Sequence, residues 1–247
     1  MVVIPTYNEV ENIEKLACAI LRLKIGATIL FVDDNSSDGT TALARELAQR
    51  YQQVEVLFRP RKMGLGSAYV DGFRHALKHG AELIFGMDAD FSHDPEALPN
   101  FLTIIRDYDL VIGSRYVADG RIEGWPLRRL LLSRLANAYA ACLLPFHLYD
   151  YTSGFKCFRR EVLESIDLDG IMSDGYAFQI EMHDLALRQG FRVKEIPIVF
   201  REREFGFSKI SRRIVLEAFL LCLRLRAPVA TIVKHLFFFR AALCREI

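Results

Sequence analysis

The first half of the chain alternates short apolar runs with longer segments in which apolar residues recur every three or four positions. Ile13, Leu16 and Ile20, for example, would share one face of a helix. The apolar runs have the length of buried strands and lie at residues 1–5, 28–32, 54–58, 82–87 and 109–112. This alternation predicts an α/β fold in which helices cover both faces of a mostly parallel central sheet.

Local signals mark where the intervening helices begin. Asn8 and Glu11 have the spacing of a capping box. Asp38 is placed to cap the helix that runs to about residue 50, and Pro95 suits the first turn of another helix. A further helix is predicted at residues 67–79.

The alternation weakens after residue 116. The predicted helices and strands of this part are residues 126–144, 154–158, 176–188 and 191–200. We expect one domain at residues 1–210, followed by C-terminal basic and amphipathic helices at residues 211–247. These helices contain apolar runs that are shorter than the about 20 apolar residues of a membrane-spanning helix. They are expected either to lie at a membrane interface or to pack on the main domain.

Composition and charge narrow the function. The 247 residues are 51% hydrophobic, which is enough for one large α/β domain with an appendage. A net charge of +1 does not indicate nucleic-acid binding, whereas ten Lys and Arg against four Asp and Glu after residue 200 favour an anionic partner such as phosphates or a membrane leaflet. The five cysteines are scattered and odd in number, so we expect reduced thiols in the cytosol. No signal peptide is expected, because the chain begins directly with a strand. Met1 lies almost at this strand, so the natural chain could begin slightly earlier.

Polar residues gather where the predicted strands end, which is the edge at which parallel sheets bind ligands. Asp88-Ala89-Asp90 follows one apolar strand. Two carboxylates at this spacing can approach Mg²⁺ or Mn²⁺, which would neutralise charge on a departing diphosphate. A solvated loop in which one acid caps the next helix is the alternative.

Two further clusters are each open to two interpretations. Asp33-Asp34-Asn35-Ser36 either binds the base and ribose of a nucleotide or forms an Asx turn. Lys62-Met63-Gly64-Leu65-Gly66 either lets the backbone approach a ligand closely or is an ordinary turn. This loop lacks the spacing of a Rossmann fingerprint or a P-loop, which argues against a dehydrogenase or a kinase-like ATPase.

Taken in order, these motifs resemble the family 2 glycosyltransferases, which have the GT-A fold. The motifs are Ile4-Pro5-Thr6-Tyr7-Asn8-Glu9, Val32-Asp33-Asp34-Asn35-Ser36, Met87-Asp88-Ala89-Asp90 and Gly113-Ser114-Arg115-Tyr116. Those of the second half resemble polyprenyl-phosphate (dolichyl-phosphate) mannosyltransferases: Arg128-Arg129, Ser133-Arg134, Thr152-Ser153-Gly154-Phe155, Asp174 to Met182 and Gly206-Phe207-Ser208-Lys209. The resemblance extends from the first strand to about residue 217.

The resemblance implies an inverting, metal-dependent transfer of a hexose, mannose from GDP-mannose, to a polyprenyl or dolichyl monophosphate. The nucleotide site would be formed by Pro5, Tyr7, Glu9, Asp33 and Asp34, together with Asp88. Asp88 and Asp90 would hold Mg²⁺ or Mn²⁺ and the diphosphate. Some relatives have Gln two places after the second Asp. Here Ser92 stands at that position, so either Ser92 or water would take the place of that ligand.

Basic residues would bind the phosphates. The resemblance places Arg115, Arg129, Arg203 and Lys209 near the phosphate groups. Ser133, one helical turn beyond Arg129, would lie on the same helix face and could donate to the same phosphate. Guanidinium groups bind phosphate oxygens with two parallel hydrogen bonds and keep their charge at any working pH. For each arginine alone, a surface ion pair is the better explanation. The set taken together favours phosphate binding, with Arg115 and Arg129 as the strongest candidates. Glu202 and Glu204, which flank Arg203, would reduce its local positive potential.

The expected acceptor determines the mechanism. A phosphate monoester is largely ionised near neutral pH, because its second pKa is about 6, so it can attack the anomeric carbon without a side-chain base. Asp90, Arg115 and Arg129 would carry this single in-line displacement. A sugar-hydroxyl acceptor would need a general base, for which Glu181 is the candidate; a structural role is the alternative.

Other functions stay open at this point. They are a lipid-phosphate glucosyl or other sugar transferase that uses a UDP-sugar, a family 2 transferase acting on a saccharide hydroxyl, and a catalytically silent scaffold. The polyprenyl tail is expected to approach along Trp125, Leu130, Leu131, Leu132 and Leu135, which are alternatively ordinary core residues. The protein would then be cytoplasmic and peripheral on the cytoplasmic face of a membrane, alone or with a membrane-protein partner.

Overall fold

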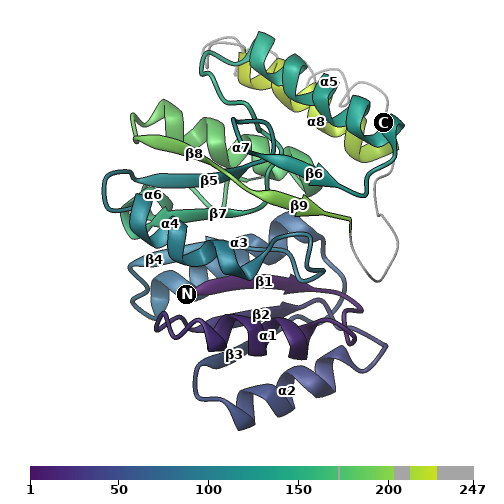
Figure 1. Cartoon of the computed structure of the whole chain (residues 1–247), viewed down its shortest axis with the longest axis vertical. Helices are drawn as coiled ribbons and strands as arrows, with labels where there is room; N and C mark the ends of the chain where they lie inside the picture. Colours follow the sequence, from purple (N-terminus) through teal and green to yellow (C-terminus); the bar gives the residue numbers. More distant parts are fainter. Residues whose placement is uncertain (172, 203–211, 227–247) are drawn as a thin grey trace, which may run out of the picture.

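Seven strands form one sheet in the order β3-β2-β1-β4-β7-β5-β8 within the part of the chain that the computed structural model describes, residues 1–171, 173–202 and 212–226 (Figure 1). They are β1 Val2–Thr6, β2 Ile29–Asp33, β3 Val54–Phe58, β4 Leu83–Gly86, β5 Leu110–Ser114, β7 Lys156–Arg159 and β8 Val193–Pro197. Every neighbouring pair is parallel except those of β7, which runs antiparallel to β4 and β5. The predicted α/β fold with a mostly parallel sheet is confirmed.

Helices cover both faces of this sheet. They are α1 Ile13–Arg22, α2 Thr40–Arg50, α3 Leu65–Lys78, η1 Pro95–Ala97, α4 Leu98–Ile104, α5 Leu127–Leu143, α6 Arg160–Ser165, α7 Gly175–Arg188 and α8 Arg212–Arg226. On β1, Val3 packs into one core with α3, α6 and α7, whereas Val2 and Ile4 pack into a second core with α1, α2 and α4. Alternate side chains of a strand point to opposite faces, so each face of β1 needs its own helical cover.

The start of α1 differs from the expected capping box. The helix begins at Ile13, with Asn12 as its N-cap residue. Asn8 lies in a left-handed turn with φ of 57°, and its Oδ1 accepts a hydrogen bond from Ser37 N at 3.0 Å. Asn8 therefore joins the two loops at the ends of β1 and β2. The N-cap residue of α2 is Gly39 rather than the expected Asp38. The carboxylate of Asp38, one residue earlier, still accepts a hydrogen bond from Thr40 N at 3.0 Å at the start of the helix.

The predicted strand at residues 191–200 is divided between two sheets. β8 ends at Pro197, although Ile198 N still donates a hydrogen bond to the carbonyl oxygen of Ser114 at 3.1 Å. The chain then enters β9 Val199–Arg201, which pairs with β6 Arg121–Glu123 in a separate two-stranded sheet. This sheet carries the segment after β5 over the end of the main sheet, where α5 begins.

α5 and α8 lie side by side at the end of the molecule opposite β3 and α2 (Figure 1). Tyr139 on α5 donates a hydrogen bond to the carbonyl oxygen of Phe219 on α8, and Arg188 on α7 donates to that of Leu225. The described part of the C-terminal segment thus packs on the domain. The expected second helix lies outside the described residues.

The described chain contains no helix long and apolar enough to cross a membrane. Among the described residues, Cys18, Cys142, Cys157 and Cys222 are free thiols. Cys244 lies outside the described residues.

Candidate active site

A cavity of about 370 Å³ opens where β1, β2 and β4 end, at the predicted edge of the sheet. The predicted residues that line it are Pro5, Tyr7, Glu9, Asp34, Asp88, Asp90, Ser92, Arg115 and Arg129. Segments far apart in sequence meet here because the carboxyl ends of parallel strands converge on one edge. The glycine loop contributes Lys62 and Gly64, and the start of α7 contributes Tyr176.

Asp33 supports the site without lining the cavity. The residue is fully buried, and its carboxylate accepts hydrogen bonds from Thr6 Oγ1 at 3.0 Å and from Thr41 Oγ1 at 2.6 Å. It also accepts from the backbone N–H and hydroxyl of Ser36. This is the Asx-turn interpretation of the cluster, so Asp33 shapes the loop on which Asp34 stands.

Asp34 lines the cavity and is held by the glycine loop. Its Oδ2 accepts hydrogen bonds from the backbone N–H groups of Met63 and Gly64, at 3.1 and 3.2 Å, and its Oδ1 pairs with buried Arg59. Sequence reasoning missed Arg59, although its position directly after β3 was a signal. Gly64 has φ of +106°, and a Cβ there would lie 2.4 Å from Asp174 Oδ2. Glycine is therefore required by both backbone conformation and space.

Asp88 and Asp90 lie side by side after β4, and each is oriented by a neighbour. The Tyr69 hydroxyl donates a hydrogen bond to Asp88 Oδ1 at 3.0 Å, and the Ser92 hydroxyl donates one to Asp90 Oδ1 at 2.6 Å. Neither acid caps the following helix, because Asp94 accepts the hydrogen bond from Glu96 N. Among the described residues, no group of three or more His, Cys, Asp or Glu side chains surrounds a common point that would hold a metal.

His93 fixes the backbone between the two acids. Its Nδ1 accepts a hydrogen bond from Asp88 N at 3.0 Å, which requires the tautomer with hydrogen on Nε2. The ring is stacked on Phe155 and almost completely buried, and this burial lowers the pKa of His93 below its ordinary value. His93 is thus a neutral support for Asp88.

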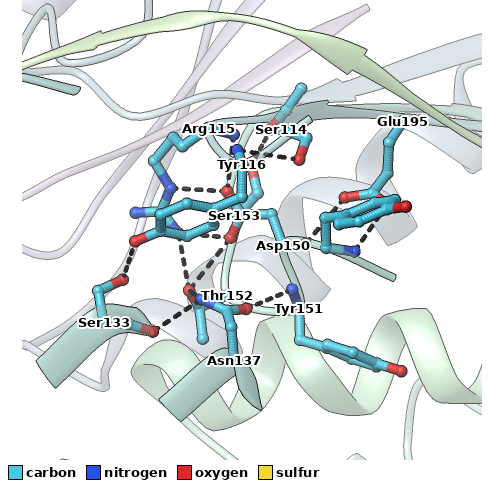
Figure 2. A network of polar contacts seen from close by, with 12 residues as sticks. Ser114, Arg115, Tyr116, Ser133, Asn137, Asp150, Tyr151, Thr152, Ser153 and Glu195 are labelled. Carbon is cyan, nitrogen blue, oxygen red and sulfur yellow. Dashed lines mark hydrogen bonds and ion pairs between the residues drawn. The ribbon is translucent and has the colours of Figure 1, made fainter. Parts of the chain in front are cut away.

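Arg115 is held by a buried carboxylate that sequence reasoning missed. Asp150 is fully buried and accepts hydrogen bonds from Arg115 Nε at 2.7 Å and from Arg115 Nη2 at 2.5 Å (Figure 2). Nη2 also donates to Thr152 Oγ1 at 2.7 Å. Burial alone would lower the pKa of Arg115, but the charge and hydrogen bonds of Asp150 raise it above its ordinary value. The guanidinium group therefore stays charged and fixed.

Asp150 is itself fixed by its surroundings. Glu195 on β8 accepts hydrogen bonds from the backbone N–H groups of Tyr149 and Asp150, each at 2.8 Å (Figure 2). Asn137 on α5 accepts from Tyr151 N at 2.7 Å. The only sequence signal was the position of Asp150, two residues before the motif that begins at Thr152.

Arg129 also faces a carboxylate. Its Nη1 donates to both oxygens of Glu202, at 2.6 and 2.7 Å, and its guanidinium carbon lies 4.0 Å from the ring centre of Trp125. The Nε of Arg129 is buried and has no hydrogen-bond partner among the described residues. Ser133 accepts a hydrogen bond from the Tyr116 hydroxyl at 2.8 Å. Arg203 and Lys209 lie outside the described residues.

A second cavity of about 250 Å³ adjoins the first between α5, α7 and α8. Trp125, Leu132 and Leu135 line it as expected, whereas Leu130 and Leu131 do not. Its remaining walls are mostly apolar or aromatic and include Tyr139, Ile180 and Phe219. Arg115, Arg129, Thr152 and Tyr176 line both cavities. A polar and an apolar cavity thus share a boundary that carries two arginines.

Glu181 lines neither of these two cavities. Its carboxylate accepts a hydrogen bond from the Ser173 hydroxyl, and burial raises its pKa above the ordinary value. In this position the Glu181 carboxylate supports the start of α7.

The chain is a glycosyltransferase and belongs to glycosyl transferase family 2, whose model matches residues 1–167. Polyprenol monophosphomannose synthase of Mycolicibacterium smegmatis is 47% identical over 220 residues, which cover 88% of this chain and 83% of that protein. Undecaprenyl-phosphate mannosyltransferase of Micrococcus luteus is 43% identical over 218 residues, covering 88% and 90%. The expected family is confirmed.

A solved structure supports the fold. Glucosyl-3-phosphoglycerate synthase from Mycobacterium tuberculosis, in complex with Mn²⁺, UDP-glucose and phosphoglyceric acid, superposes with a TM-score of 0.65. The match covers 90% of this chain and 78% of that chain at 18% identity. At this identity the likeness concerns the fold alone.

Proposed function

We propose that this glycosyltransferase moves mannose from GDP-mannose to the phosphate of a polyprenyl monophosphate, with inversion at the anomeric carbon. The observation that carries the proposal is the pair of adjoining cavities, one polar and one apolar, with Arg115 and Arg129 lining both. A lipid phosphate has the same two parts, an anionic head and an apolar tail. The names of the two relatives, a polyprenol monophosphomannose synthase and an undecaprenyl-phosphate mannosyltransferase, point the same way.

The polar cavity is suited to the donor. Pro5, Tyr7, Glu9 and Asp34 form its wall at the ends of β1 and β2, where the nucleoside would bind. Lys62 stands at the same wall, with its Nζ 4.0 Å from the ring centre of Tyr7, and places a positive charge near the diphosphate. Ligands of open α/β sheets bind at this edge.

The donor atoms of Asp88 and Asp90 fit a hard divalent cation. Both carboxylates line the cavity, and Mg²⁺ or Mn²⁺ at such sites usually takes its remaining ligands from water and substrate phosphates. When bound, the cation supplies positive charge against the leaving diphosphate. Hydrogen bonds from Tyr69 and Ser92 orient the two carboxylates.

The two arginines are suited to the acceptor phosphate. Asp150 fixes Arg115 through Nε and Nη2, so Nη1 is the part of the guanidinium group left for a ligand. The Nε of Arg129 and the Nε1 of Trp125 are buried N–H groups without partners among the described residues. A phosphate oxygen bound here would satisfy such donors and be held for attack on the anomeric carbon.

No side chain needs to remove a proton in this reaction. The phosphate is already ionised near neutral pH, with a second pKa of about 6. Glu181, the candidate base, lines neither cavity. The arginines would orient the nucleophile, and Asp88 and Asp90 would act on the leaving group.

Charge at the acceptor side is nearly balanced before any ligand binds. Asp150 compensates Arg115, and Glu202 compensates Arg129. The first pair is almost completely buried, but the side chains of Arg129 and Glu202 are 14% and 34% exposed. We therefore propose that the acceptor phosphate displaces Glu202 from Arg129, whereas Asp150 stays in place.

The apolar cavity would receive the first isoprene units of the acceptor. Leu127, Leu131 and Leu135 of α5 form an exposed stripe beside it, at 67%, 51% and 67% exposure. Such a stripe is suited to lie against the membrane that holds the rest of the tail. We accordingly propose a peripheral enzyme on the cytoplasmic face of a membrane.

A panel of donors tests this proposal. GDP-mannose and UDP-glucose, each with a labelled sugar, are incubated with the enzyme, a short polyprenyl phosphate in detergent, and Mg²⁺ or Mn²⁺. We expect labelled lipid from GDP-mannose only. EDTA should abolish it, and Asp90→Ala should reduce the rate by about a thousandfold or more. Labelled lipid from UDP-glucose instead would show that UDP-glucose is the donor. Transfer that continues in EDTA would contradict the proposed cation site.

A further inference from the structure

One buried polar atom in the donor cavity has no partner. Gln179 lies on α7, lines the polar cavity and is 3% exposed. Its Oε1 has no hydrogen-bond partner among the described residues. Buried amide oxygens are almost always bonded, because an unpaired one loses the hydrogen bonds it had with water. This oxygen therefore points to a ligand that supplies a donor.

The space beside Gln179 is left by a glycine. A Cβ on Gly154 would lie 3.4 Å from Gln179 Nε2 and 3.5 Å from Asp88 Oδ1. Gly154 has no left-handed φ, so its backbone does not require glycine. What the position provides is the absence of a side chain where the amide of Gln179 and the carboxylate of Asp88 converge.

Aromatic packing fixes Gln179 relative to Asp88. Phe178, its neighbour on α7, stacks on Tyr69 with ring centres 5.7 Å apart and an interplanar angle of 3°. The Tyr69 hydroxyl in turn donates a hydrogen bond to Asp88 Oδ1. The two polar groups therefore keep a constant relation, as a binding site for a small rigid ligand requires.

We propose that Gln179 and Gly154 form the subsite for the hexose of the donor. The inference rests on the proposed function, in which Asp88 faces the diphosphate and the sugar is the next group along. A carboxamide has an acceptor oxygen and a donor nitrogen side by side, so it can bind two neighbouring hydroxyl groups. Gln179 would thus bind the sugar and distinguish one hexose from another, whereas the nucleotide binds to the other wall.

The test compares two ligands that differ only by the sugar. Dissociation constants of GDP and GDP-mannose are measured by calorimetry with Mn²⁺ for the wild type, Gln179→Met and Gly154→Ala. Methionine keeps the volume of glutamine without its polar atoms, and the new methyl of alanine meets its neighbours at ordinary contact distance. We expect both variants to bind GDP-mannose about tenfold more weakly while GDP affinity changes less than about twofold.

A matched control uses the same substitution at the exposed end of the same helix. Gln189 follows α7, and its side chain donates a hydrogen bond to the carbonyl oxygen of Ser165, so Gln189→Met should leave both affinities unchanged. Variants that weaken GDP and GDP-mannose equally, or neither, would overturn the subsite.

The donor assay separates this inference from the proposed function. If the wild type uses UDP-glucose, the same comparison is made with UDP and UDP-glucose. A wild type that transfers mannose, together with variants that bind GDP-mannose normally, removes the subsite and keeps the function.

Discussion

At the scale of single residues, the proposed binding of the acceptor phosphate depends on how Arg115 and Arg129 are held in place. Arg115 adds little net charge to the cavity, because its ion pair with buried Asp150 compensates its positive charge. What this buried pair provides is a guanidinium group in a fixed position. Arg129 is less constrained, since its partner Glu202 is partly exposed. The two arginines therefore have different expected roles, one as a rigid support and one as a group that exchanges partners.

The variant Asp150→Asn tests whether Asp150 holds the guanidinium group of Arg115 in a fixed position. The substitution keeps the size of the side chain but leaves the buried charge of Arg115 without a counterion. We expect the free energy of unfolding to fall by about 3 kcal/mol and sugar transfer to fall with it. Urea unfolding and initial rates measure the two effects.

The double variant Arg115→Met, Asp150→Asn is the control for this experiment. Removing both charges should recover part of the lost stability but none of the lost activity. A double variant with wild-type activity would show that Arg115 does not take part in transfer.

Glu181→Gln tests the mechanism without a base, and its stability gives an internal check. Burial raises the pKa of Glu181 above its ordinary value, so the native state favours the protonated form. The wild type should therefore lose stability relative to the variant as pH rises from about 4.5 through the raised pKa. Transfer should stay within about threefold of the wild type.

Unfolding in urea from about pH 4 to pH 8 measures the stability difference. A loss of transfer by several orders of magnitude in folded Glu181→Gln would make Glu181 the general base. The saccharide-hydroxyl acceptor would then be favoured over the phosphate.

At the scale of elements, hydrophobic periodicity predicted the regular half of the fold well. The strands β1 to β5 and the helices α3, α5 and α7 lie where the pattern placed them. The pattern did not predict β6, because three residues with two exposed side chains leave no apolar signal. It also could not give the direction of β7, since strand pairing depends on the path of the chain between elements rather than on the strand itself.

The exposed stripe of α5 carries the prediction for the membrane. Replacing Leu131 and Leu135 by Gln removes apolar surface that is already exposed, so folding should be unaffected. We expect binding to phospholipid vesicles, measured by sedimentation, to fall about tenfold or more. Phe58→Gln, an exposed apolar residue on β3 at the opposite end of the molecule, should leave binding unchanged (Figure 1). Equal vesicle binding by all three proteins would contradict the proposed membrane face.

At the scale of the whole molecule, the sequence predicted the residues that line the polar cavity better than the residues that hold them in place. Asp88 and Asp90 follow a recognisable strand, so their place at the edge of the sheet could be inferred. Asp150 could not be assigned in the same way, because its partner Arg115 is 35 residues away and comes from another element. Such pairings become visible only when the tertiary structure brings the segments together.

The central proposal is that the acceptor is a phosphate attached to an apolar tail, and the two adjoining cavities support it. The most direct measurement is the initial rate of mannose transfer to three acceptors: a short polyprenyl phosphate, the corresponding free polyprenol, and a phosphate monoester without the tail. We predict transfer to the polyprenyl phosphate, none to the alcohol, and a rate lower by about a hundredfold or more for the phosphate without a tail. Transfer to the alcohol at a rate comparable to that of the polyprenyl phosphate would contradict this account.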